Sequence, residues 1–256
     1  MHERPRHNRW AGAAQYSGAL ALFVALGFVN VKAQQPDFTG VWTNYVEPGQ
    51  GRAGGAATAG GGRGGAAELP MTAEGRQKVQ AYQALIKGTG DTPGGFCLGT
   101  GMPGSMLGSG GYPMEIIQRP NQITIVYEAH NEVRRVYLGD RIVPEGDRLP
   151  GRNGHSTGRW EGDTLIVETT NLVEQADQRF AHSDKARIVE RYRMTKGAKG
   201  ERVLVAEMTL TDPVFYTKPV TQEKRWAEVP NGHLLPYECN EEAWNIHLEK
   251  LAEKRK

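Results

Sequence analysis

The sequence has no apolar stretch long enough to span a membrane and no excess of charge of either sign. Its longest apolar run, Ala19–Val29, has eleven residues, whereas a membrane-spanning helix needs about twenty. Lys and Arg total 31 and Asp and Glu total 29 in 256 residues, so the composition predicts no polybasic surface for nucleic acid or anionic lipid. We therefore expect no nucleic-acid partner, and no membrane span in the mature protein.

The first 33 residues have the layout of a secretory signal peptide. Arg4, Arg6 and Arg9 form a positive head, the apolar run follows, and a small residue stands at the cleavage position. No cysteine follows the run, which argues against a lipoprotein anchor. We predict that residues 1–33 are removed and that the mature chain begins at Gln34, with 27 basic and 28 acidic residues. The protein is then periplasmic or secreted; an uncleaved membrane anchor is the alternative.

Cysteine is scarce, and export changes how the only two are interpreted. In an oxidising compartment Cys97 and Cys239 are expected to form a disulfide rather than a metal or catalytic site. The bridge would close a loop of about 140 residues and contribute up to roughly 5 kcal/mol in the chain-entropy model. The alternative is two free thiols.

Glycine and proline are abundant, with 33 and 14 residues, and they favour a turn-rich β chain over a helix bundle. Residues 49–67 hold nine glycines and no large apolar residue, so we predict a flexible loop there. The predicted organisation is a signal peptide (1–33), a first-strand region (34–48), the flexible loop (49–67), a β-barrel domain with a preceding helix (68–239) and a C-terminal helix (240–256).

From Met114 onward, short β-like runs recur at regular intervals, with turn sequences between them and no intervening helices. One helix is predicted from about Thr72 to Lys87 and another from Asn240 to about Lys254. This pattern is typical of an antiparallel barrel or sandwich. The predicted strands are 37–44, Met114–Gln118, Gln122–Glu128, Val133–Leu138, Gly158–Trp160, Thr164–Thr170, Arg187–Met194, Arg202–Leu210 and Thr221–Val229.

Two motif matches lack the structural context that their chemistry needs. Gly154–Gly158 fits the G-x-S-x-G nucleophile elbow, but no buried strand precedes it and a hairpin follows it instead of a helix. The stretches 49–54 and 99–104 fit G-x-G-x-x-G without a preceding parallel strand or a following helix. We therefore predict neither a serine nucleophile nor a dinucleotide, and no other cofactor.

The mature chain has five histidines, and none forms a compact metal-ligand pair, so no metal site is predicted. His182-Ser183-Asp184 directly precedes a predicted strand. In one interpretation Asp184 caps backbone amides in a turn. In the other, a carboxylate orients the His182 imidazole for general base catalysis.

Glu190 is the most informative single residue. Alternation along 187–194 places it on the apolar face of its strand, opposite a row of arginines. An inward carboxylate must be paired, hydrogen-bonded or protonated. It either forms a buried salt bridge with Arg134 or Arg135, or it serves a ligand or the chemistry with a raised pKa. The pattern of 133–138 does not decide which arginine points inward.

Short motifs resemble those of known β-barrels. Gly40-Val41-Trp42 resembles the G-x-W signature of lipocalins, and Trp160–Leu165 resembles the hairpin of intracellular lipid-binding proteins, which share the calycin architecture. The chain is also similar to a group of uncharacterised exported bacterial proteins over most of 36–240. It departs from that group in the insert at 49–67 and in lacking a histidine between Gly139 and Pro144. The segments that carry this resemblance are 36–42, 154–167, 182–184 and 212–219.

The resemblance implies a mainly β fold, an antiparallel lipocalin-like barrel with one helix before the main strand set and one after it. Such a barrel has room for one small ligand. We therefore predict an exported protein that binds a small, partly apolar organic ligand; the oligomeric state is left open. The alternatives are a barrel enzyme (hydrolase, lyase or isomerase) and an envelope interaction protein without a cavity. Predicted ligand-binding residues are Tyr127, Arg135 and Tyr192. Predicted catalytic residues are His155, His182, Asp184 and Glu190.

Overall fold

The computed structural model describes residues 35–46, 69–108 and 111–253. The predicted signal peptide and the predicted flexible loop at 49–67 lie outside these described residues.

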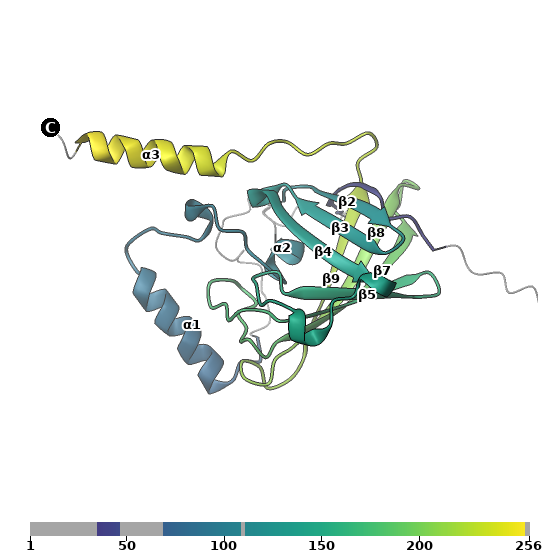
Figure 1. The fold of residues 1–256 in the computed structure, drawn as a ribbon, viewed down its shortest axis with the longest axis horizontal. Coiled ribbons are helices and arrows are strands. Elements are labelled where there is room, and N and C mark those ends of the chain that lie inside the picture. Colours follow the sequence, from purple (N-terminus) through teal and green to yellow (C-terminus); the bar gives the residue numbers. More distant parts are fainter. Residues whose placement is uncertain (1–34, 47–68, 109–110, 254–256) are drawn as a thin grey trace, which may run out of the picture. The chain divides into compact units, whose positions relative to one another are not determined.

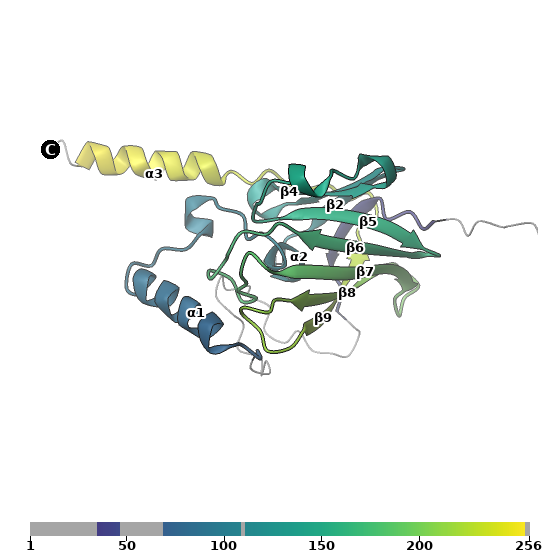
Figure 2. The same cartoon turned by 60° about the horizontal axis from the view of Figure 1, so that its bottom comes forward.

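Nine strands pair in chain order and close into a barrel (Figure 1). Figure 2 shows β5 to β9 side by side along one wall. The mainly β fold predicted from the short alternating runs is confirmed, and a barrel is formed rather than a sandwich. The strands are β1 Gly40–Asn44, β2 Met114–Arg119, β3 Gln122–Tyr127, β4 Glu132–Leu138, β5 His155–Glu161, β6 Thr164–Thr170, β7 Arg187–Lys196, β8 Arg202–Thr211 and β9 Val220–Glu228.

One strand pair departs from the predicted antiparallel order. β4 and β5 are parallel, with Val136 beside Ser156 and Leu138 beside Gly158, whereas the other neighbours are antiparallel. Parallel neighbours need a long connection, and residues 139–154 supply it by crossing back to the end where β4 begins. The predicted antiparallel pairing therefore holds between all neighbouring strands except this pair.

The two long predicted helices are confirmed. α1 spans Ala73–Ile86, and the Thr72 side chain caps it by accepting a hydrogen bond from the Gly75 amide at 3.0 Å. α3 spans Cys239–Glu253. No helix in the described part of the chain combines the length and the apolar character that crossing a membrane requires. The shorter helices are α2 Gly104–Gly108 and the 3-10 turns η1 Gly94–Phe96, η2 Ala129–Asn131, η3 Gly139–Arg141 and η4 Glu145–Asp147.

The two ends of the barrel differ in their connections. At one end, which we call the turn end, short turns join neighbouring strands at 120–121, 162–163 and 197–201. The opposite end, the loop end, gathers mostly longer segments. Because long loops on a rigid barrel are the usual place for functional residues, the loop end is where a site is expected. Its segments are 87–108, 128–131, 148–154, 171–186 and 212–219.

Side chains fill the barrel interior. Met102 and Met106, which precede β2, are 0% and 1% exposed and pack among the inward-facing strand residues. A segment outside the sheet therefore closes the loop end of the core. Core residues contributed by the strands include Trp42, Met114, Ile116, Ile123, Ile125, Tyr127, Val136, Leu138, Leu165, Val167, Ile188, Tyr192, Leu204, Ala206, Met208, Leu210, Val220 and Trp226.

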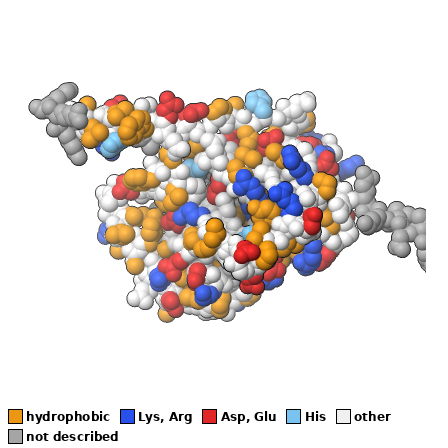
Figure 3. All heavy atoms as spheres, in the orientation of Figure 1, with side chains coloured by type: hydrophobic (Ala, Val, Ile, Leu, Met, Phe, Trp, Pro, Cys, Tyr) orange, Lys and Arg blue, Asp and Glu red, His pale blue; other side chains and the backbone are white. Residues whose placement is uncertain are grey.

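Charged residues of both signs share the outer surface. On β6 and β7, Arg187 donates two hydrogen bonds of 2.7 Å to Glu168, and on β5 Arg159 pairs with Glu161. Figure 3 shows acidic and basic side chains interspersed over the face that it displays. This mixture agrees with the balanced charge of the sequence.

Candidate functional site

A buried ion pair crosses the barrel interior. Arg134 and Glu190 are 1% and 0% exposed; Arg134 Nη1 donates to Glu190 Oε1 at 3.0 Å, and Nη2 donates to Oε2. Ser156 and Thr169 accept from the same guanidinium at 3.1 and 2.9 Å, and the Tyr192 hydroxyl donates to Glu190 at 2.8 Å. Every nitrogen of the guanidinium and both oxygens of the carboxylate are engaged, so Glu190 has no unpaired carboxylate oxygen.

The predicted orientation of Glu190 is confirmed, and the structure decides which arginine is its partner. Arg134 points inward, while Arg135 is exposed on the outer face of β4. Tyr127 and Tyr192, also predicted to bind ligand, are both buried inside the barrel, and burial raises the pKa of each. The Tyr127 hydroxyl has no hydrogen-bond partner among the described residues.

His182 is buried at the loop end in a defined tautomeric state. Its Nδ1 lies 3.0 Å from the Phe180 carbonyl, which can only accept, so the ring proton is on Nδ1. Its Nε2 is therefore an acceptor, and it has no partner within the described part of the chain. Burial lowers the pKa of His182, so the imidazole is neutral at neutral pH.

The turn beside His182 is held by a carboxylate that the sequence interpretation did not single out. Asp212 accepts from the Ser183 amide at 2.6 Å and from the Ser183 hydroxyl at 2.9 Å. It also accepts from the Val214 amide at 2.9 Å. Asp184, which was expected to cap this turn, is exposed and pairs with Lys185. Asp212 takes that role because it lies at the end of β8, where its carboxylate reaches two loops.

His155 lies on the other side of the barrel wall from Glu190. Its neighbour Ser156 faces the interior, so the His155 ring lies on the outer face, stacked on Tyr137 with ring centroids 5.1 Å apart. Burial, followed by the charge of Arg148, lowers the pKa of His155. The four predicted catalytic residues thus occupy different places: Glu190 inside, His155 outside, His182 in a buried loop and Asp184 at the surface.

A glycine-rich segment, residues 99–108, closes the loop end, and we call it the plug. Glu132 at the start of β4 accepts from the Gly101 amide at 3.0 Å and from the Ser105 hydroxyl. Arg152 donates to the Gly99 carbonyl at 2.8 Å and accepts from the Met102 amide at 2.9 Å through its own carbonyl. The plug backbone is therefore held by side chains and loops and not by strand pairing.

Two glutamines of the 171–186 loop hold the plug from the other side. Gln175 Nε2 donates to the Thr100 carbonyl at 2.9 Å, and Gln178 Nε2 donates to the Met102 carbonyl at 3.3 Å. Glycine is required at position 101, where the plug touches Arg152 and Gln175. Gly101 has φ +75°, and an added Cβ would lie 2.6 Å from the Arg152 carbonyl oxygen and 2.8 Å from Gln175 Oε1. The glycine at position 101 therefore allows the plug to pack closely against the loop end of the barrel.

Buried polar atoms without a partner gather at the loop end. In the described residues they belong to loop-end segments or to strand ends that border them. Because the amide nitrogens of Gln175, Gln178 and Asn153 donate to oxygen atoms, their unpaired atoms are the carbonyl oxygens. Together with His182 Nε2 these are four unused acceptors, and buried polar groups are normally paired. The full set is Tyr127 OH, His130 Nδ1, Asn153 Oδ1, His155 Nε2, Gln175 Oε1, Gln178 Oε1 and His182 Nε2.

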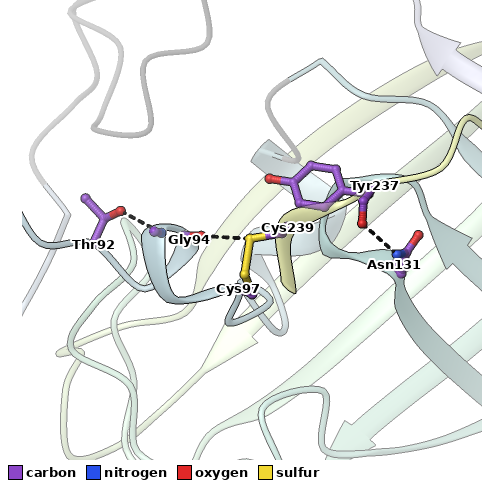
Figure 4. Close-up of a disulfide and its surroundings, with 7 residues drawn as sticks. Thr92, Gly94, Cys97, Asn131, Tyr237 and Cys239 are labelled. Carbon is purple, nitrogen blue, oxygen red and sulfur yellow. Dashed lines mark hydrogen bonds between the residues drawn. A yellow bond between two sulfur atoms is a disulfide. The ribbon is translucent and has the colours of Figure 1, made fainter. Parts of the chain in front are cut away.

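The predicted disulfide is confirmed and borders the plug. Cys97 and Cys239 are bonded, with their Cα atoms 5.5 Å apart (Figure 4). Beside the bridge, the side-chain amide of Asn131 donates to the Tyr237 carbonyl at 3.0 Å. The bridge therefore ties the segment that leads into the plug to the first residue of α3.

The described residues form no metal site, since no three His, Cys, Asp or Glu side chains among them converge. A groove of about 440 Å³ lies on α1, lined by Ala73, Glu74, Gln77, Lys78 and Ala81. Its residues are those of an exposed helix face and include none of the predicted site residues.

No known family model matches the chain, and no curated protein matches its sequence.

Proposed function

We propose that the protein is an exported barrel that binds a small, partly apolar organic molecule at the loop end, beneath the plug. The observation that carries this proposal is the group of unused acceptors formed by Asn153, Gln175, Gln178 and His182. A buried acceptor without a partner costs about 1–3 kcal/mol. A ligand with N–H or O–H groups recovers that free energy, so such a ligand is favoured.

The residues beside these acceptors suit the apolar part of such a ligand. Met102 and Met106 of the plug are buried, and methionine side chains adapt to irregular shapes. The plug is attached by hydrogen bonds from Arg152, Glu132 and the loop glutamines. Its movement breaks those bonds and leaves the strand pairing intact, which gives a ligand a route to the interior.

Two features support export. The first 33 residues have the signal-peptide layout, and the Cys97–Cys239 disulfide is of a kind that persists in oxidising compartments. Intact mass of protein recovered from outside the cytoplasm should correspond to a chain beginning at Gln34. Recovery of a chain that retains residues 1–33 in the cytoplasm would contradict export.

Native mass spectrometry of the protein purified from the cells that produce it tests the binding function. We expect a non-covalent adduct of constant mass that is lost on denaturation. Gln178→Leu removes one unused acceptor and should lower the adduct occupancy. Gln80→Leu on the exposed face of α1 is the matched control and should leave occupancy unchanged. Bare protein under these gentle conditions would overturn the proposal and favour an interaction protein with a filled core.

A further inference from the structure

Lys224 is a charged residue on the inward face of β9. It lies opposite Ala206 of β8, which lies opposite Tyr192 of β7. Directly opposite residues of antiparallel strands point to the same side of the sheet, and Tyr192 is buried in the interior. Lys224 therefore points into the barrel. Ala206 beside it is small and buried.

Lys224 is an inward charge without an oppositely charged partner among the described residues. Arg134 pairs with Glu190 and Arg202 pairs with Glu228. Lys224 makes no hydrogen bond or ion pair with any residue in the described ranges, and burial alone lowers its pKa, with no contribution from a neighbouring charge. An ammonium group removed from water without a partner is unfavourable, so this position favours an anion supplied from outside.

Lys224 lies beyond the described pairing between β1 and β9. Pairing between β1 and β9 covers Glu228 to Trp226 and ends where the Tyr45 amide donates to the Arg225 carbonyl at 3.1 Å. Beyond that point, residues 220–224 have no described strand partner on the β1 side. Lys224 is half-buried, so solvent reaches its side chain.

We propose that Lys224 receives the anionic head group of the ligand, which makes the natural ligand an organic acid with a carboxylate. This inference rests on the proposed binding function and names its ligand class. The inward residues Trp226 of β9 and Met208 of β8 near Lys224 are apolar and buried. They offer contact surface to the body of such a molecule, while a cationic ligand is repelled by the ammonium group.

Titration of the lysine itself provides the test. In protein labelled with ¹³C at the lysine ε-carbons, the Lys224 signal is followed while benzoate, hexanoate or decanoate is added, with the matched neutral amides as controls. We expect at least one carboxylate to move the Lys224 signal and to raise its pKa, because an anion stabilises the ammonium form. No effect of any carboxylate, or an equal effect of the amides, would overturn the proposal.

Two variants show whether the charge carries the affinity. Lys224→Met keeps an unbranched side chain of similar length without the charge and should weaken carboxylate binding about tenfold or more, since the paired charge is lost. Lys218→Met, an exposed lysine at the loop end, should leave the affinity within about twofold, as expected for a solvated charge. Equal binding by Lys224→Met and the parent protein would show that Lys224 only extends toward solvent.

Native mass spectrometry separates the two proposals. An adduct that persists unchanged in Lys224→Met, or a recovered ligand without an acidic group, refutes the role of Lys224 and leaves the binding function standing. Absence of any adduct in the parent protein refutes the binding function itself.

Discussion

Arg134 and Glu190 face each other inside the barrel from β4 and β7, and the two nitrogens of the guanidinium fork donate to the two carboxylate oxygens. Ser156 and Thr169 accept further hydrogen bonds from the same guanidinium. Both residues are buried, so water cannot replace a hydrogen bond that the pair loses. This relationship favours a structural role for Glu190.

Glu190→Gln should therefore destabilise the protein. The amide keeps the shape but strands the Arg134 charge, and breaking a buried pair costs about 3–5 kcal/mol. Urea unfolding of the variant measures this cost. Glu168→Gln, which breaks an exposed pair with Arg187, is the matched control and should cost about 1 kcal/mol or less. Unchanged stability of Glu190→Gln would show that Glu190 is strained for function.

Gly101→Ala should dislodge the plug. The position has φ +75°, and the new Cβ would clash with the Arg152 carbonyl at 2.6 Å. Gly139→Ala measures the cost of the left-handed backbone conformation without a clash, since Gly139 has φ +55° and nothing lies within 4 Å of the added carbon. The left-handed conformation costs about 1–2 kcal/mol in both variants, and overpacking adds about 1–3 kcal/mol at Gly101 alone. Thermal melting and proteolysis near 99–108 measure the difference; equal losses in the two variants would contradict the close contact.

Stability should fall as the pH falls below about 6.5, the ordinary histidine pKa, and His182 should account for part of that loss. Burial lowers its pKa in the folded state, so the unfolded chain binds the proton first and stability rises with pH through this window. Urea unfolding at pH 7 and pH 5 measures the slope. His182→Gln should flatten it, whereas His247→Gln on exposed α3 should not. A slope unaffected by His182→Gln would contradict this assignment.

Mature protein should contain no alkylatable thiol before reduction, because Cys97 and Cys239 are bridged. Intact mass after alkylation, with and without prior reduction, checks this. The double variant Cys97→Ala/Cys239→Ala should lose up to about 5 kcal/mol, since the bridge closes a loop across most of the barrel. Two modified cysteines in unreduced protein would contradict the bridge.

Local sequence determined the elements whose two faces differ in polarity. Along β7, apolar residues alternate with arginines, so the inward direction of Glu190 followed from the period of a strand alone. The cap at Thr72, the turns at 120–121 and 162–163 and the helix beginning near Cys239 are likewise set by neighbouring residues. These elements were predicted close to their observed bounds.

Tertiary structure decided the side-chain directions and contacts that arise only when the barrel closes. β4 carries apolar side chains on both faces, with Val133 38% exposed and Val136 buried, so periodicity did not show that Arg134 points inward. Between Val220 and Trp226, β9 has only polar residues, and the register with Ala206 alone reveals that Lys224 faces the interior. The parallel pairing of β5, the plug and the role of Asp212 arise from contacts between residues far apart in the chain. Local periodicity carries no information about such contacts, because they form only when the nine strands close.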